Sequence, residues 1–204
     1  IALLSGCAQQ VLAPGINLAT IDILVRHGIE VNIPETQGCC GALAWHIGDG
    51  SRARDQARQN LKAFPGEIDA VITNAAGCGS GLKEYPLILA GTREVEDARA
   101  FADKVSDISV FLDTMNLPPP PDPGKKISIA YHDACHLAHA QGVRDAPRKL
   151  LQSIPGVNLV ELPDTNLCCG SAGTYNLDHP GIAAELGKKK AAIIAATGAD
   201  MVAS

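Results

Sequence analysis

The chain has 204 residues, of which 46% are hydrophobic and 19% charged, and it carries a formal net charge of -5. This balance is typical of a globular protein, and the length allows one large domain or two small ones. A mildly acidic chain lacks the clustered positive charge that binds nucleic acid or an anionic membrane surface. No apolar run approaches the roughly 18 residues of a membrane-spanning helix, and no signal segment opens the chain, so we expect a cytoplasmic protein.

Six short segments rich in β-branched residues predict strands. Helix-forming segments lie between them, and such alternation is typical of parallel sheets with right-handed crossovers. The sequence therefore predicts the α/β class. The predicted strands are 1–5, 29–33, 69–73, 127–131, 157–162 and 200–204.

Three of the intervening segments carry clear helix signals. The first ends at Gly28, the second begins near Ser51 and stops at Pro65, and the third has Pro180 at a first helical position and Gly198 beyond its end. Apolar residues recur at helical spacing in the first two. We expect these to be buried: Ile16, Ala19, Ile23 and Leu24 in the first helix, and Ala53, Ala57, Leu61 and Phe64 in the second.

The tripeptide Cys-Cys-Gly occurs twice, at 39–41 and 168–170. A single cysteine precedes each copy at a similar distance, Cys7 by 32 positions and Cys135 by 33. The predicted elements around the two copies follow in the same order, so we interpret the chain as an internal repeat.

The repeat predicts two tandem lobes, each a small parallel sheet with flanking helices. The first is expected at residues 1–116 and the second at 125–204. Residues 117–124 carry five prolines, which predicts a stiff extended linker. Because the first residue is Ile1 and not Met, we expect the chain to be part of a longer protein.

All seven cysteines follow predicted strands, at the carboxyl edge where open parallel sheets form their binding crevice. An odd number of cysteines in a reducing compartment argues against a disulfide framework and favours metal or redox chemistry. The fourth ligand of the second site is expected at about position 209, from the spacing in the first copy. The predicted first site consists of Cys7, Cys39, Cys40 and Cys78, and the second contains Cys135, Cys168 and Cys169.

Converging thiolates suit an iron-sulfur cluster, and glycines beside them let the backbone approach a bulky inorganic core. Three alternatives remain open. A structural zinc ion also binds four thiolates, although neighbouring cysteines are awkward at one small tetrahedral ion. A reversible disulfide within either Cys-Cys pair would make a thiol sensor, and free cysteines can also be buried as small hydrophobic residues.

The double pattern of one cysteine, Cys-Cys-Gly and a further cysteine resembles the cysteine-rich CCG domain pair of heterodisulfide reductase and its relatives, over essentially all 204 residues. The amino-acid sequences of the motifs are similar to those of one branch of this family, the iron-sulfur subunit of bacterial glycolate oxidase. The similar segments are "GCAQ" at 6–9, "GCCGAL" at 38–43, "AAGCGSGLKEY" at 75–85 and "LCCGSAGTYNLDHP" at 167–180.

This resemblance implies an electron-transfer subunit that holds [4Fe-4S] clusters through the seven cysteines. It implies partner subunits that carry FAD and oxidise glycolate to glyoxylate, electron flow toward the respiratory chain, and contact with the inner face of the cell membrane through partners. Members of this branch also carry an N-terminal ferredoxin-like region, which the present sequence lacks. Related subunits for lactate utilisation or anaerobic glycerol-3-phosphate oxidation share the double motif and remain alternatives.

One position departs from the heterodisulfide reductase pattern. That enzyme continues its third cysteine position as Cys-x-x-Cys, and here the matching residue is Gly81. The resemblance then implies four thiolates in the first site, which favours electron transfer over disulfide cleavage. A disulfide-reducing subunit and, outside redox chemistry, a zinc-stapled interaction module are the other candidates.

Other polar residues near the motifs carry weaker signals. Three histidines, His132, His136 and His139, surround Cys135 and are candidates for a ligand or a helix cap. The lysine run 188–190 is interpreted as the solvent-facing side of a helix. We assign no catalytic acid, base or nucleophile.

Overall fold

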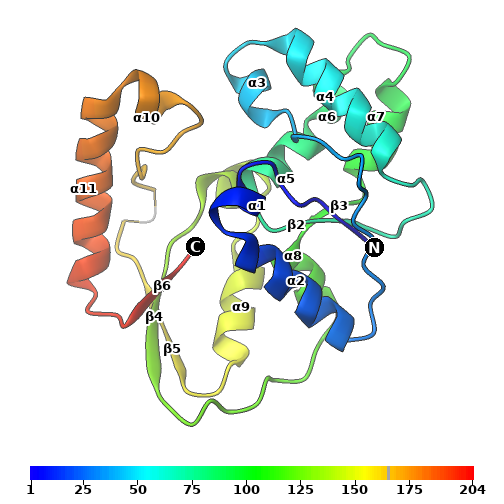
Figure 1. Ribbon diagram of the computed structural model, residues 1–204. Coiled ribbons are helices and arrows are strands. Elements are labelled where there is room, and N and C mark those ends of the chain that lie inside the picture. Colours follow the sequence, from blue (N-terminus) through cyan, green and yellow to red (C-terminus); the bar gives the residue numbers. More distant parts are fainter. Residues whose placement is uncertain (165) are drawn as a thin grey trace. The chain divides into compact units, whose positions relative to one another are not determined.

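A computed structural model describes residues 1–164 and 166–204 (Figure 1). The chain divides into two compact units, Ile1–Phe111 and Leu112–Ser204. The proline-rich stretch 117–124 forms no helix or strand. Each unit contains one parallel sheet of three strands with flanking helices, which confirms the predicted α/β class.

The sheet of the first unit has the order β1-β2-β3, with β1 at Ala2–Leu3, β2 at Val71–Thr73 and β3 at Val105–Asp107. Sequence patterning did not predict β3, which is three residues long and carries only one large apolar side chain. All pairings are parallel, with Ala2 opposite Val71 and Val71 opposite Val105.

The strand predicted at 29–33 is reduced to a single bridge between Asn32 and Ala2. Asn32 exchanges two backbone hydrogen bonds with β1, both of 2.9 Å, to Ile1 and Leu3. The next donor in a parallel ladder would be residue 34, and Pro34 has no N–H to give. The ladder therefore stops there, and the predicted strand was wrong in extent.

Helices cover both faces of this sheet. One core cluster joins the sheet residues Ala2, Leu4 and Val71 to the helices on one side, and a second joins Leu3 and Ile72 to the other side. Figure 1 shows α4, α6 and α7 on one side and α2 and α8 on the other. The helices are α1 Gln9–Leu12, α2 Pro14–Arg26, α3 Ala42–His46, α4 Gly50–Ala63, α5 Ala76–Lys83, α6 Tyr85–Ile88, α7 Val95–Ala102 and α8 Ile108–Thr114, the last of which crosses the boundary between the units.

The buried face of α2 differs from the prediction. Leu24 is buried as expected, but Ile16 is 46% exposed and the other buried positions are the polar residues Asn17 and Thr20. Apolar periodicity missed these residues because hydrogen bonds, not apolar character, favour their burial.

The predicted buried face of α4 is confirmed at three positions. Ala53, Ala57 and Phe64 are buried as expected. The helix is capped by Asp49, whose carboxylate accepts from the N–H of Arg52 at 3.1 Å, and the predicted cap Ser51 is wrong.

The second unit repeats the topology of the first. Its sheet has the order β5-β4-β6, with β4 at Ile127–Tyr131, β5 at Val157–Glu161 and β6 at Met201–Ala203. Strand β4 lies between β5 and β6 just as β1 lies between Asn32 and β2. This shared strand order is what an internal repeat requires.

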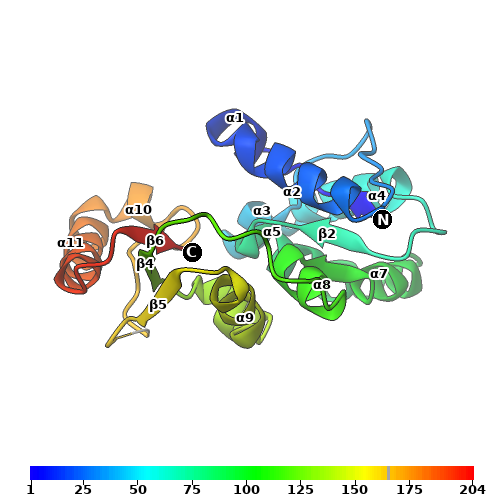
Figure 2. The same ribbon diagram turned by 90° about the horizontal axis from the view of Figure 1, so that it is seen from below.

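In Figures 1 and 2, α9 and α11 flank this sheet on opposite sides. The long α11 begins at Pro180 and ends before Gly198, which has a positive φ of 65°, as the sequence predicted. No helix within residues 1–164 and 166–204 has the length and apolar character to cross a bilayer. The helical segments of this unit are the π-helix η1 His136–Ala140, α9 Asp145–Ser153, α10 Tyr175–Asp178 and α11 Pro180–Ala196.

A partly buried ion network joins three segments of the second unit. The guanidinium of Arg148 on α9 donates to both carboxylate oxygens of Asp133, at 2.8 and 2.7 Å, and to both of Glu161 on β5, at 2.8 Å each. It also lies over the ring of Tyr131, 4.6 Å from the centroid. The Asp133 side chain is only 3% exposed, and its bond from Arg148 holds the pKa of this carboxyl below its ordinary value of 3.8.

Replacing Asp133 by Asn should lower the free energy of unfolding by about 2–3 kcal/mol, because a largely buried guanidinium loses its charged partner. Since the folded pKa is lowered, the carboxylate contributes stability above pH 3.8 and loses it as the pH falls further. The difference between wild type and D133N in urea unfolding should therefore shrink below about pH 4. The control is Glu185→Gln, which removes an exposed pair with Lys188 and should change stability by less than about 0.5 kcal/mol.

Candidate functional site

The four cysteines of the first unit lie on three segments that meet at the carboxyl edge of its sheet. Cys7 follows β1, Cys39 and Cys40 follow the bridge at Asn32, and Cys78 lies in α5, which follows β2. Parallel strands carry successive connections back to the same edge. The fold therefore brings together thiols that are up to 71 positions apart in sequence.

These four residues form one group of neighbouring thiols. Cys7 Sγ donates to Cys39 Sγ at 3.4 Å. Cys39 and Cys78 pack against the core cluster that contains Cys40. The group extends from the surface inward, because Cys7 is exposed and Cys40 is only 5% exposed.

Neighbouring thiols shift one another's acidity. Interaction with Cys40, with burial, raises the pKa of Cys39 far above its ordinary value of 9.0. Interaction with Cys39 lowers the pKa of Cys40, but the neighbouring Cys78 and burial outweigh this and raise it to about 12. Interaction with Cys40 lowers the pKa of Cys78. Several thiolates in one place repel one another unless a cation binds among them.

Side-chain amides hold the Cys7 loop in place. Because Pro34 cannot extend the ladder, the Gln37 side chain makes the next hydrogen bonds to the chain after β1. It accepts from the N–H of Ser5 at 2.9 Å and donates to the carbonyl of Leu3 at 3.2 Å. Asn17 on α2 donates to the Ser5 carbonyl at 2.8 Å. The polar face of α2 thus serves the loop that carries Cys7.

A second polar group holds the Cys-Cys loop. Asn60 on α4 is fully buried, accepts from the N–H of Gly38 at 2.8 Å and donates to the carbonyl of Cys39 at 3.0 Å. It also donates to the hydroxyl of Tyr85, at 2.8 Å, which donates to the carbonyl of Cys40 at 3.1 Å. Burial raises the pKa of Tyr85, so this hydroxyl keeps its proton and remains a donor.

Neither Asn60 nor Tyr85 was predicted from the sequence as a site residue. The available signal is a polar residue in line with the apolar positions of α4, since Ala53, Ala57 and Asn60 are all buried. Such a residue must find partners in the core, which marks it as a structural or functional position.

The same backbone conformation explains why a glycine follows each Cys-Cys pair. Gly41 and Gly170 have positive φ values of 85° and 87°. A Cβ on Gly41 would lie 3.4 Å from the carbonyl oxygen of Ala53, and one on Gly170 only 2.3 Å from that of Ala183. Both glycines are therefore favoured by their positive φ, and at Gly170 the close approach of the helix backbone excludes a Cβ as well.

Gly81, the position at which the sequence departs from the heterodisulfide reductase pattern, is buried against α3. A Cβ added there would lie 2.6 Å from the Cβ of Ala42. Ala42 thus occupies the space that a fifth sulfur-bearing side chain at position 81 would need.

The second unit places its cysteines differently. Cys135 and Cys168 are exposed, Cys169 is partly buried, and the Cys168 sulfur accepts from the N–H of Gly170 at 3.3 Å. Within the described part of this unit, no thiol-thiol hydrogen bond joins Cys135 to Cys168 or Cys169. In the first unit, by contrast, Cys7 contacts Cys39. The ligand sets of both sites stay predictions.

Lys190 corrects one expectation. The lysine run 188–190 was interpreted as solvent-facing, but Lys190 is only 3% exposed, and its ammonium donates to the carbonyl of Asp164 at 3.0 Å. This carbonyl belongs to the segment that leads from β5 to Cys168. Charge alone suggested exposure, whereas the position of Lys190 on α11 faces it inward.

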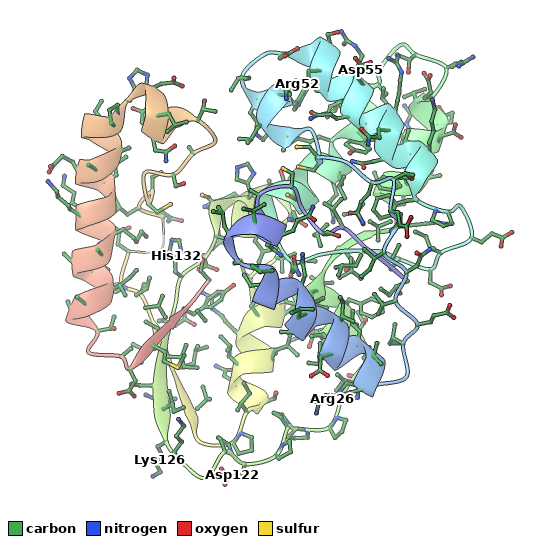
Figure 3. All side chains as sticks on the ribbon, in the orientation of Figure 1. Arg26, Arg52, Asp55, Asp122, Lys126 and His132 are labelled. Carbon is green, nitrogen blue, oxygen red and sulfur yellow. The ribbon has the colours of Figure 1, made fainter. Side chains whose placement is uncertain are left out.

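The histidines near Cys135 do not form a common site. His132, labelled in Figure 3, lies just beyond β4 with its Nδ1 3.0 Å from the hydroxyl of Ser204. Burial, and then the charge of Lys190, lower its pKa. His139 lies 3.3 Å from Arg144. No histidine, cysteine, aspartate or glutamate cluster arranged to hold a single metal ion occurs among residues 1–164 and 166–204.

All seven cysteines are free thiols. In the first unit, the donor set fits an iron-sulfur cluster, because four thiols follow strands at one edge of the sheet and adjacent Cys39 and Cys40 lie in one packed cluster with Cys78. A cluster with several metal atoms can use two neighbouring sulfurs, whereas a single tetrahedral ion uses them poorly.

Comparison with known protein families identifies one domain type twice in the chain. The family model described as the CCG cysteine-rich domain matches residues 1–83 and again residues 129–204. The two matches correspond to the two copies of the repeat.

Several curated proteins are similar along nearly the whole chain. A subunit of the fumarate reductase (CoM/CoB) of Methanothermobacter marburgensis is 36% identical over 99% of this chain, and the probable glycolate oxidase iron-sulfur subunit of Bacillus subtilis is 36% identical over 99%. Lactate utilization protein A of Oceanobacillus iheyensis is 35% identical over 98%. The chain spans 39% and 46% of the first two relatives and 82% of the third.

Replacing Gly170 by Ala should destabilise the second unit by about 2 kcal/mol or more, because the new Cβ meets a backbone oxygen and the positive φ is strained. Thermal unfolding followed by circular dichroism measures this. Gly181→Ala is the matched control, since Gly181 lies in α11 with open space around it, and this variant should be as stable as wild type or more so. Equal melting temperatures for G170A and G181A would contradict the prediction.

Proposed function

Because the chain belongs to the CCG cysteine-rich domain family, we propose that it is the cluster-binding part of an iron-sulfur subunit that transfers electrons in a flavin-dependent 2-hydroxy acid oxidoreductase. One observation carries this proposal, namely that three segments of the first unit bring four thiols to one edge of its sheet. There Cys7 contacts Cys39, and Cys39 and Cys78 pack against the cluster that contains Cys40. Relatives whose names include an iron-sulfur subunit, such as that of Bacillus subtilis, support it.

In the proposed first centre, Cys7, Cys39, Cys40 and Cys78 hold a [4Fe-4S] cluster, which would take up and release single electrons when bound. The chain's own residues orient the four sulfurs and keep water from the inner ones, since Cys40 is buried. Exposed Cys7 is the point at which a partner could approach most closely. Cys135, Cys168 and Cys169 would supply three ligands of a second centre.

We propose that a partner subunit carries FAD and binds the hydroxy acid, while this chain passes electrons toward the respiratory chain. No residue of the described chain is needed as an acid, a base or a nucleophile in this role. The finer proposal is glycolate as the donor substrate, supported by the motif segments at 38–43 and 167–180, with a cytoplasmic location at the inner face of the membrane through partners. Identities of 36% and 35% support glycolate and lactate relatives alike.

Disulfide reduction is a second candidate because the double Cys-Cys-Gly pattern resembles that of heterodisulfide reductase. The contact between Gly81 and Ala42 argues against it in the first centre, because no fifth sulfur fits there without displacement of Ala42. We therefore favour a four-thiolate centre that transfers electrons.

Metal analysis of the protein purified without oxygen tests the first centre. We expect iron and acid-labile sulfide in near-equal amounts, about four of each per filled site, and an electron paramagnetic resonance signal after reduction. Cys39→Ser and Cys40→Ser should each remove most of the signal of the first centre, while Ser51→Ala on the exposed side of α4 should leave it intact. Zinc alone, or no metal, would contradict the cluster and favour a structural staple or a thiol switch.

The four-thiolate geometry has its own test. Gly81→Cys should destabilise the first unit by about 1–3 kcal/mol because its side chain collides with Ala42. The double variant with Ala42→Gly, which removes the colliding methyl group, should recover part of the loss. If G81C alone is as stable as wild type and changes the resonance spectrum, the site has room for a fifth thiolate and the four-thiolate proposal is wrong.

The donor substrate is tested with the flavoprotein partner present. Glycolate should bleach the visible absorbance of the oxidised cluster faster than lactate or glycerol 3-phosphate at equal concentration. Faster bleaching by lactate would assign the complex to lactate oxidation and leave the cluster proposal standing.

A further inference from the structure

Two adjacent cysteines that serve one centre pose a backbone problem. In an extended chain, successive side chains point to opposite sides, so Cys39 and Cys40 would diverge. Here Cys39 contacts Cys7 and also packs, with Cys78, against the buried cluster that contains Cys40. The backbone must therefore bend at this point and stay bent, and the bend leaves the carbonyls of both residues inside the protein, where each needs a donor.

Asn60 and Tyr85 supply these donors from two different helices. The amide nitrogen of Asn60 donates to the Cys39 carbonyl at 3.0 Å, and the hydroxyl of Tyr85 donates to the Cys40 carbonyl at 3.1 Å. The amide oxygen of Asn60 accepts from the N–H of Gly38 at 2.8 Å. Three consecutive residues of the loop are thus held by two side chains.

The network is complete and rigid. Asn60 uses both hydrogens of its amide nitrogen, one for Cys39 and one for the Tyr85 hydroxyl at 2.8 Å. The two side chains are fully buried, and the ring of Tyr85 stacks on Phe101 with centroids 5.5 Å apart. A fully satisfied buried network specifies one conformation, because any other would leave buried polar groups without partners.

The same helix position is used in the second repeat. Asn60 lies seven residues beyond Ala53, whose carbonyl meets Gly41, and Lys190 lies seven residues beyond Ala183, whose carbonyl meets Gly170. Lys190 is also buried, and it also donates to a backbone carbonyl of the segment before its Cys-Cys pair. This position of the helix therefore holds the thiol-bearing segment in both units, through an amide in one and an ammonium in the other.

We infer that Asn60 and Tyr85 are positioning residues, which fix the backbone at Gly38, Cys39 and Cys40 so that both adjacent sulfurs join Cys7 and Cys78. They act through the two carbonyls. The inference rests on the proposed function only for its effect on a bound cluster, because the backbone effect exists in the metal-free protein.

The metal-free protein gives the first test. Tyr85→Phe removes one hydroxyl and keeps the ring that packs on Phe101, so this variant should fold. Amide hydrogen exchange of the segment 38–42, measured by mass spectrometry, should accelerate about 10-fold, as expected for the loss of one buried hydrogen bond. Asn60→Leu should accelerate it more. Unchanged exchange in Y85F would overturn the inference, whether or not the wild type binds iron.

The iron-loaded protein gives the second test. A chelator should remove iron from Y85F about 10-fold faster than from wild type, and the resonance spectrum of the reduced cluster should change. Phe101→Leu is the matched control, because it loosens the same core and leaves the hydroxyl in place. It should lower the melting temperature with an unchanged spectrum.

The outcomes separate the inference from the proposed function. Equal spectral changes in Y85F and F101L would overturn the positioning role, since general loosening would then explain both. Faster exchange in metal-free Y85F together with a wild type that holds no iron would support the positioning role and contradict the iron-sulfur function.

Discussion

Crowding of thiols at one edge of a sheet is the constraint on which the rest of the first unit depends. Charges on neighbouring sulfurs repel one another, so several thiolates are unfavourable there until a cation enters. Holding such groups together requires rigid support from outside the site. The fold provides it by ending parallel strands at one edge and by placing buried polar side chains behind each loop.

These supports explain residues that otherwise look misplaced. Asn17 on α2 and Asn60 on α4 occupy helix faces where apolar residues are expected, and each donates to a carbonyl of a thiol-bearing loop. Gln37 continues the ladder of β1 where Pro34 ends it. The same helices therefore support both the hydrophobic core and the site, because polar residues replace apolar ones at some of their buried positions and bond to the loops.

The two repeats show which of these features belong to the fold and which to the individual site. Both keep the strand order and the glycine packed against a helix backbone. They differ at one inward helix position, where the first has neutral Asn60 and the second has Lys190. A buried ammonium in one repeat alone gives the two thiol-bearing segments different electrostatic surroundings.

The sequence by itself determined the α/β class and the repeat, because strand patterning and repeated spacing are local properties of the chain. It also predicted the four cysteines of the first site. The sequence patterns did not predict β3, predicted too long a strand at 29–33 and predicted the wrong buried face for α2. Only the tertiary structure decided which polar residues are buried, that Ala42 closes the space beside Gly81, and that Asn60 and Tyr85 meet at the Cys-Cys loop. These depend on contacts between segments far apart in sequence, which no local pattern records.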